Sequence, residues 1–323
     1  MSFLDNEQLL SIDHAAKLLR SGELVAIPTE TVYGLAANAF NADAVRKIYE
    51  SKGRPSNNPL IVHIKSADEL DKVAIEIPAL ARRLAHEFWP GPLTLILKKR
   101  ASISNIISAN HATVAVRVPN HPLTQELLRL IDFPLVAPSA NRSNHISPTR
   151  PEHVRNSLGD RTPYILDGGA CQEGLESTIV GFQDEDVVLY RQGTVALETL
   201  EKFIGKKLII KSEEQKQSIS PGTANKHYAP KTPMILVDEE IRPEHYGNQK
   251  AGFLTLKPLE FIHKNHHNVA LSDSGNLQEA ASNLYSALYA LDAMNLDCIV
   301  AELMPNLGLG LAINDRLKRA AAD

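Results

Sequence analysis

Short apolar runs rich in β-branched residues, each bounded by Pro, Gly or Asn, recur through the first two-thirds of the chain. Runs of this length and composition predict β-strands. Between some of them apolar residues recur at helical spacing, as Val45, Ile48 and Tyr49 do after a candidate Asn41 helix cap. The expected helices cover Asp43–Ser51, Ile77–Phe88 and Pro122–Ile131, and the expected strands are Leu24–Pro28, Pro59–Ile64, Leu93–Lys98, Val114–Val118, Pro134–Pro138, Thr178–Phe182 and Val187–Arg191.

These elements do not form a regular βαβ series, so we expect an α/β fold with a twisted, mixed sheet. A polar stretch broken by Pro and Gly follows, from residue 211 to residue 233, and its composition is that of a linker. Beyond it the pattern alternates β/α and predicts a small second domain over residues 234–323. Its expected elements are the strands Met234–Val237, Gly252–Leu256 and Cys298–Leu303 and the helix Leu277–Met294.

Composition excludes several classes of protein. Of 323 residues, 43% are hydrophobic and 22% are charged, which excludes a disordered chain. The length favours two domains, no apolar run is long enough to span a membrane, and the first residues do not have the pattern of a signal peptide. Two distant cysteines, Cys171 and Cys298, suit a reducing cytoplasm. Lys and Arg number 34 against 38 Asp and Glu, a net charge of −4, which argues against a bulk nucleic-acid coat but leaves a local basic site open.

Strand alternation singles out one arginine. In the strand expected at Val114–Val118, Val114, Val116 and Val118 share one face, and Thr113, Ala115 and Arg117 share the other. An arginine among core valines is costly to bury unless an anion pairs with it. Either a structural carboxylate or a ligand fills that role, and we favour the ligand. By the same alternation His63 lies beside Ile61, where a hydrogen-bonded structural histidine is the more frequent case.

Several loops at strand ends carry groups suited to anions. In Lys52–Pro59 two cations flank Gly53; a helix cap explains Lys52 and Gly53 but not Arg54 or Asn58. Segments 28–35 and 136–143 end strands in small hydroxyl, amide and carboxylate groups, which suit either a cleft or a polar turn.

Familiar nucleotide and hydrolase motifs are missing from the sequence, including the Walker loop, Gly-x-Gly-x-x-Gly and Gly-x-Ser-x-Gly. His263, His266 and His267 lie in a Lys/Asn-rich stretch and are expected in a solvated loop rather than at a metal. The residues alone therefore predict a nucleotide- or anion-binding cleft without an obvious nucleophile.

Taken together, six ordered segments over about residues 10–200 resemble the Sua5/YrdC/YciO family of threonylcarbamoyladenylate synthases, and the linker with its small second domain resembles the longer, Sua5 branch. The matching segments are Pro28–Leu35, Lys52–Pro55 with Asn58–His63, Trp89–Thr94, Val116–Pro119, Ala137–Asn141 and Glu176–Thr178, followed by Ser220–Thr223 and His227–Pro230 in the linker.

The resemblance implies a YrdC-like domain with a concave basic cleft (1–210), a linker that reaches the active site (211–233) and a Rossmann-like C-terminal domain (234–323). It implies that L-threonine, bicarbonate or CO₂ and ATP give threonylcarbamoyl-AMP and pyrophosphate, with Mg²⁺ neutralising charge and no metal ligand from protein side chains. The product would pass to other proteins that modify tRNA position 37, with weak or indirect tRNA contact and no membrane. The implied threonine contacts are Thr31, His63, Arg117, Ala137 and Ser177, and the implied ATP contacts are Lys52, Arg54, Asn58, Thr113, Ser139, Asn141, Ser147, Arg191 and Tyr228.

Such a reaction needs positioning and charge stabilisation, supplied by Lys52, Arg54 and Arg117, rather than a covalent intermediate. Two alternatives stay open: an RNA-binding module without adenylate synthesis, and a YciO-like relative with different acyl-phosphate or adenylate chemistry. The role of the C-terminal domain is equally open between a lid, a regulatory dock and simple support.

Overall fold

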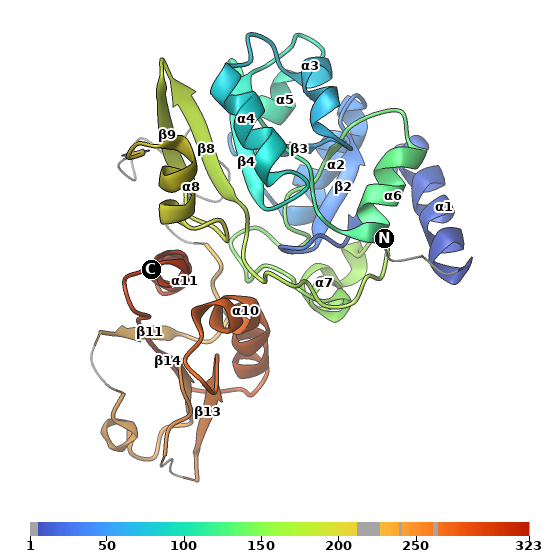
Figure 1. The fold of residues 1–323 in the computed structure, drawn as a ribbon. Helices are drawn as coiled ribbons and strands as arrows, with labels where there is room; N and C mark the ends of the chain where they lie inside the picture. The colour runs from blue at the N-terminus through green and yellow to red at the C-terminus, as the bar shows by residue number, and fades with distance from the viewer. Residues whose placement is uncertain (1–5, 212–226, 239–240, 261–263, 323) are drawn as a thin grey trace.

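The computed structural model describes residues 6–211, 227–238, 241–260 and 264–322. Within these residues it has two sheets, which belong to successive parts of the chain (Figure 1). We call the part with the larger sheet the first domain and the part with the smaller sheet the C-terminal domain. The expectation of a mixed-sheet α/β domain followed by a small β/α domain is confirmed.

The first domain is built on a mixed sheet that has ten strands in the described residues. Parallel and antiparallel pairs alternate irregularly across it. In spatial order the strands are β10 (Ile209–Ile210), β9 (Asp186–Arg191), β8 (Thr178–Gln183), β4 (Leu93–Lys98), β5 (Thr113–Arg117), β3 (Ile61–His63), β6 (Leu135–Val136), β2 (Gly34–Asn38), β1 (Val25–Ile27) and β7 (Tyr164–Ile165).

Helices cover this sheet through two separate cores. The larger core joins α2, α4, α5, α7 and α8 to the central strands, and a smaller one joins α1 and α6 to β1, β2 and β6. The helices of the first domain are α1 (Asn6–Arg20), α2 (Ala42–Lys52), α3 (Leu70–Val73), α4 (Ala79–Phe88), α5 (Asn105–Ser108), α6 (Pro122–Leu130), α7 (Pro151–Leu158) and α8 (Leu197–Ile204), with single 3₁₀ turns at Ala67–Glu69 and Gly159–Arg161.

The alternation predicted for the central strands is confirmed. Val114, Val116 and Val118 all belong to the larger core. Ala115 lies on the opposite face, in a small buried cluster made of strand residues alone, with Ile61, Ile96 and Ile179. This second face therefore has an apolar floor that no helix in the cluster covers, and His63 and Arg117 lie on it at the ends of β3 and β5.

Local signals at the ends of α2 explain the loop that follows it. The side chain of Asn41 accepts hydrogen bonds from the backbone N–H groups of Asp43 and Ala44, which caps the helix as predicted. Gly53 ends the helix at a φ of 60°, a left-handed conformation that glycine adopts without a Cβ penalty. The chain then turns back toward the sheet and delivers Arg54.

The C-terminal domain is a parallel sheet of four described strands covered by two long helices. Its main core includes residues from both helices and also Val32, Ile146 and Leu175 of the first domain. The two domains thus share apolar packing. In spatial order the strands are β11 (Met234–Val237), β14 (Cys298–Glu302), β12 (Ala251–Thr255) and β13 (His266–Ala270), and the helices are α10 (Leu277–Asp292) and α11 (Leu309–Ala320), with a 3₁₀ turn at Pro243–Tyr246.

Every predicted strand and helix is present, with ends that agree to within two residues. The elements that were not predicted are the helices α1, α3, α5, α7, α8 and α11 and the strands β2, β7, β10 and β13. The expectation of a solvated histidine loop is wrong for His266, which is buried in β13 against the ring of Phe253, whereas His267 is exposed and His263 lies outside the described residues. Among the described helices, none has the length and apolar character to cross a membrane.

Candidate active site

A small cavity at the end of β3 and β5 gathers most of the predicted site residues. Its volume is about 50 Å³, below the roughly 300–1,000 Å³ typical of ligand pockets. A larger cavity of about 420 Å³ lies between α7 and α10, but none of the predicted site residues lines it. The small cavity is lined by Thr31, Val32, Arg54, Pro59, Leu60, Ile61, His63, Arg117, Ala137, Pro138, Ser139, Glu176, Ser177, Arg191, His227 and Tyr228.

Arg117 lines the cavity and forms an ion pair with a carboxylate of the protein. One terminal nitrogen, Nη2, lies 2.7 Å from Oε1 of Glu30, and both side chains are about 95% buried, at 5% and 4% exposed. The Nε–H donates to the carbonyl of Gly91 at 3.2 Å. The structural carboxylate is therefore present, contrary to our preference for a ligand as the partner. Within the described residues Nη1 has no polar partner, which leaves this arginine a donor for a ligand.

His63 lies beside Arg117 as a neutral ring. Burial, and then the positive charge of Arg117, lower the pKa of His63 from 6.5 to about 3. Its Nδ1 is 3.2 Å from the carbonyl of Ile61. At neutral pH an imidazole with this pKa is a hydrogen-bonding group and a poor general base.

A second cationic group comes from the loop after α2. Arg54 donates to the side chain of Asn58 at 2.5 Å and to the carbonyl of Pro59 at 2.9 Å. Burial is the main reason that the pKa of Arg54 falls to about 10, so it keeps its charge at neutral pH. Asn58 thus acts on Arg54 rather than lining the cavity.

Lys52 ties the neighbouring loop to the site. Its buried ammonium donates to the carbonyls of Ser139 and Asn141, at 2.5 and 2.6 Å. Burial, and then the charge of Arg54, lower the pKa of Lys52 well below its ordinary value. The amide nitrogen of Asn141 in turn donates to the carbonyls of Arg142 and His145. This loop is therefore held in shape by the residues predicted to bind nucleotide.

A third arginine is fixed by the strand opposite. Arg191, at the end of β9, donates from Nε to the carbonyl of Ser177 at 3.0 Å and from Nη2 to its hydroxyl at 3.1 Å. The same hydroxyl is 2.7 Å from that of Thr94. Three arginines, Arg54, Arg117 and Arg191, therefore converge on one cavity, and the only carboxylate among its described lining residues is Glu176.

The segment after the undescribed part of the linker fills the rest of the cavity. His227 and Tyr228 are buried there, and Tyr228 has a φ of 63°, an unfavourable value for a residue with a side chain. Ala229 donates from its N–H to the carbonyl of Asn144 at 2.9 Å, which seats the segment on the first domain.

Comparison with known proteins places this site in a family. The family model described as "Telomere recombination", which groups Sua5, YciO and YrdC, matches residues 17–193, and the model described as "Threonylcarbamoyl-AMP synthase, C-terminal domain" matches residues 195–322. The chain belongs to the Sua5/YciO/YrdC family.

Full-length relatives carry both parts of the chain. A threonylcarbamoyl-AMP synthase of Bacillus subtilis is 42% identical over 320 residues, which cover 96% of this chain and 92% of the relative. The crystal structure of Pyrococcus abyssi Sua5 complexed with L-threonine is similar with a TM-score of 0.88 at 39% identity, covering 96% of this chain and 94% of that one. This chain is therefore similar to Sua5 proteins over both domains.

The residues that the family resemblance assigns to threonine all meet at the cavity. They are Thr31, His63, Arg117, Ala137 and Ser177. Of those assigned to ATP, four also line it: Arg54, Ser139, Arg191 and Tyr228. The others lie outside the lining, namely Lys52, Asn58, Thr113, Asn141 and Ser147. Thr113 is at the far end of β5, about 13 Å from Arg117 at about 3.3 Å a residue.

Reasoning from the sequence missed two carboxylates and one hydroxyl of this family site. Glu30 and Glu176 stand inside segments that resemble the family, yet only their arginine partners in space reveal their roles. Thr94 is buried beneath Ser177 and touches its hydroxyl. An acid next to hydroxyl residues at a strand end was the available signal for Glu30 and Glu176.

Proposed function

We propose that this protein is a threonylcarbamoyl-AMP synthase. The observation that carries the proposal is the juxtaposition at one cavity of Arg117, with an unused donor, and two further buried arginines, Arg54 and Arg191. The first suits a carboxylate and the others suit phosphates. Family membership over both domains supports the same activity.

The proposed reaction joins three substrates. The amine of L-threonine adds to CO₂, forming an N–C bond and releasing a proton; starting from bicarbonate, the same carbamate forms with loss of water instead of a proton. A carbamate oxygen then attacks the α-phosphorus of ATP, and the bond from that phosphorus to the bridging oxygen breaks. Threonylcarbamoyl-AMP and pyrophosphate are the products, so no side chain forms a covalent bond.

The side chains then act by position and charge. Arg117 would bind the threonine carboxylate through Nη1, while Thr31, His63, Ser177 and the backbone at Ala137 would orient the rest of the amino acid. Arg54 and Arg191 would lie against the triphosphate, where negative charge moves onto the leaving pyrophosphate. Correct placement of reacting groups can contribute about 7–11 kcal/mol.

Residues from the end of α2, the loop after it and the loop after β6 shape the nucleotide site. We assign Lys52, Asn58, Ser139, Asn141 and Ser147 to ATP, either directly or by holding the loop that faces it. We also assign Thr113 to ATP. It lies on the face of the sheet that carries the apolar cluster, and an apolar surface suits the flat base of a nucleotide.

Two features of the site bear on the nucleotide's entry and its metal. The cavity has no room for ATP while Tyr228 occupies it. We propose that the linker of residues 211–233 reaches the active site through Tyr228, which would move aside when ATP enters and then close over it. Glu30 and Glu176 are both engaged with arginines, so the described cavity offers no carboxylate for a metal. Mg²⁺ would arrive with ATP as part of the substrate.

We further propose that the product serves N6-threonylcarbamoyladenosine formation at tRNA position 37 in the cytoplasm. Other proteins would complete that transfer, and this chain would contact tRNA weakly or indirectly. The net charge of −4 agrees with that division, because a strong tRNA binder is usually basic.

One assay tests the activity. Pyrophosphate release is measured from ATP and bicarbonate, with and without L-threonine, and the adenylate is identified by mass spectrometry. We expect release only with threonine. Turnover independent of threonine would favour the YciO-like alternative, and no turnover together with strongly salt-dependent tRNA binding would favour an RNA-binding module.

A further inference from the structure

One face of the C-terminal domain is directed at two loops of the first domain. On α10 the side chains of Ser282 and Tyr289, about two turns apart, donate to the carbonyls of Gln172 and Ile146, at 2.7 and 2.8 Å. Gly174 packs on the backbone of Ser282 so closely that a Cβ would lie 2.4 Å from its carbonyl oxygen. The loop that leads into Ser177 is therefore clamped by α10.

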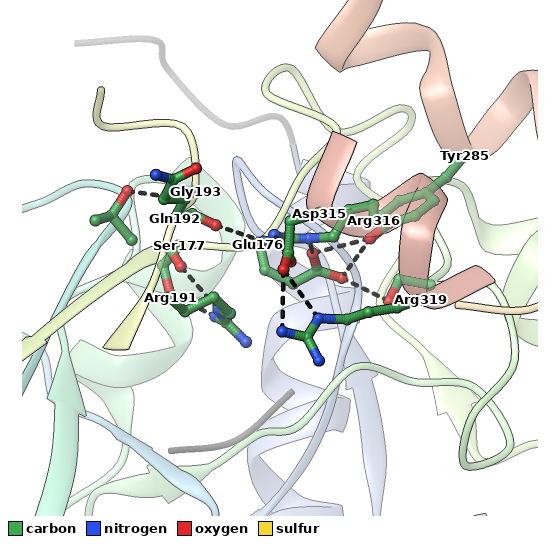
Figure 2. Close-up of polar contacts among 11 residues, drawn as sticks. Glu176, Ser177, Arg191, Gln192, Gly193, Tyr285, Asp315, Arg316 and Arg319 are labelled. Atoms are coloured by element: carbon green, nitrogen blue, oxygen red, sulfur yellow. Dashed lines mark hydrogen bonds and ion pairs between the residues drawn. The ribbon is translucent and has the colours of Figure 1, made fainter. Parts of the chain in front are cut away.

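The carboxylate of Glu176 is the centre of this contact. It accepts from Nε of Arg316 on α11 at 2.9 Å, from the hydroxyl of Tyr285 on α10 at 2.9 and 3.0 Å, and from the hydroxyl of Ser147 at 2.7 Å. Figure 2 shows Arg316 and Tyr285 converging on Glu176, with Arg191 and Ser177 beside it. Of the five segments that meet here, the three from the first domain carry residues assigned to substrate, namely Ser147, Ser177 and Arg191.

Each of the three side-chain nitrogens of Arg316 has a protein partner. Its side chain is fully buried, and its other two nitrogens donate to Asp315 and to the carbonyl of Gln192, both at 2.8 Å. Gln192 directly follows Arg191, as Ser177 directly follows Glu176. Arg316 thus holds the chain next to two residues of the cavity without lining the cavity itself.

The linker rests on the same two side chains. The guanidinium carbon of Arg316 is 5.3 Å from the centre of the Tyr228 ring, and the ring of Tyr285 is 5.7 Å from it at an angle of 30°. Cation–π and stacked contacts of this kind favour one ring position over others. The C-terminal domain therefore meets both the wall of the cavity and the segment that fills it.

We propose that Arg316 is a positioning residue: through Glu176 and Gln192 it holds Ser147, Ser177 and Arg191 where threonine and ATP bind. This inference rests on the proposed function. It assigns the C-terminal domain a part in the chemistry of the first domain. Simple support between domains is the competing explanation, because an ion pair buried at an interface also joins two surfaces.

Stability and positioning can be separated, since an ion pair buried between domains is often replaceable by neutral groups with little loss of stability. Arg316→Met alone leaves Glu176 buried without its partner and lowers the unfolding temperature. The double variant Glu176→Gln/Arg316→Met removes both charges and is expected to restore most of that temperature. Positioning predicts that its KM values for threonine and ATP nevertheless stay raised, by roughly 10- to 100-fold in all.

Two further arms complete the test on the full chain. In Arg316→Ala, millimolar methylguanidinium is expected to restore part of the threonine-dependent pyrophosphate release, and methylurea, a neutral molecule of similar shape, is not. The matched control Arg82→Met, which removes an exposed ion pair with Asp71, is expected to leave the kinetics unchanged and to lower the unfolding temperature only slightly.

Two results would overturn the inference while the parent enzyme remains active: normal KM values in the folded double variant, or no difference between methylguanidinium and methylurea. A parent protein without threonine-dependent release contradicts the proposed function instead.

Discussion

Two buried arginine–carboxylate pairs of this molecule differ in their location and in how many of the arginine nitrogens have protein partners. Arg117 and Glu30 lie within the first domain, and Arg316 and Glu176 join the two domains. In the first pair the arginine lines the cavity and has one nitrogen unpaired among the described residues, whereas in the second all three nitrogens have protein partners. Burial alone does not mark a binding arginine; a donor left over after the structural contacts does.

The carboxylates differ in the same way. Burial raises the pKa of Glu176, but the charges of Arg316 and Arg191 and the bonds from Ser147 and Arg316 outweigh it, and its pKa lies below the ordinary value. Glu176 is therefore ionised and fully engaged. Glu30, by contrast, has one oxygen at Arg117 and the other on the N–H of Asn120, so it fixes the orientation of a binding group.

Removing Arg316 is expected to have the largest effect on folding. Arg316→Ala leaves the carboxylate of Glu176 buried and uncompensated, which typically costs about 3–5 kcal/mol. Denaturant unfolding followed by circular dichroism measures the loss. An unchanged midpoint would mean that the interdomain pair adds no stability.

Arg117→Ala is expected to have the largest effect on substrate. Losing a charged hydrogen bond of about 1.5–3 kcal/mol weakens threonine binding roughly 10- to 150-fold, while ATP binding stays nearly the same. Calorimetric titration of the folded protein with each substrate measures both. Equal losses for the two substrates would contradict the assignment of Arg117 to the threonine carboxylate.

The pH dependence of stability tests whether the buried ring of His63 is neutral in the folded protein. Between about pH 6.5 and its folded pKa of about 3, His63 is neutral in the folded chain and protonated in the unfolded chain. The stability that it contributes is therefore complete above about pH 6.5 and decreases as the pH falls, by up to about 1.4 kcal/mol per pH unit. His63→Asn removes this contribution, so the stability gap between parent and variant should change from pH about 7 to pH about 5. A constant gap would show that the ring titrates normally.

The smallest effect is expected at an exposed pair of the same chemistry. Arg82 and Asp71 are 50% and 61% exposed, and such pairs contribute about 0.2–1 kcal/mol that salt screens. Arg82→Met should therefore shift the unfolding midpoint slightly, and less in high salt. A loss as large as that of Arg316→Ala would remove the contrast between exposed and buried pairs.

Local patterns in the sequence were sufficient for the central strands. The alternation of Val114, Val116 and Val118 placed Arg117 on the correct face, and the Asn41 cap and Gly53 bounded α2 correctly. These signals are short-range: a strand period of two and backbone groups at a helix end. These local signals did not predict that the five threonine residues and four ATP residues of the cavity lie together. That prediction came from the family resemblance.

Pairings between distant residues could not be predicted in this way. Glu30 and Arg117 are far apart in sequence, and Glu176 and Arg316 are separated by 140 positions. The residues that flank each member of a pair in the sequence do not indicate its partner, because the contact depends on how whole domains pack. The prediction for His266 was wrong for a related reason: its neighbours in sequence are polar, but its own side chain is buried in β13 against the ring of Phe253.

The shared packing between the domains has a consequence for modularity. Cutting this chain at the linker would leave Glu176 without Arg316 and Tyr285, and Leu175 without its apolar cover. Exchange of the C-terminal domain with that of a relative must carry the matching surface on both sides. The boundary between the two family models, at residues 193–195, therefore divides the sequence into two parts that share one apolar core and a buried ion pair.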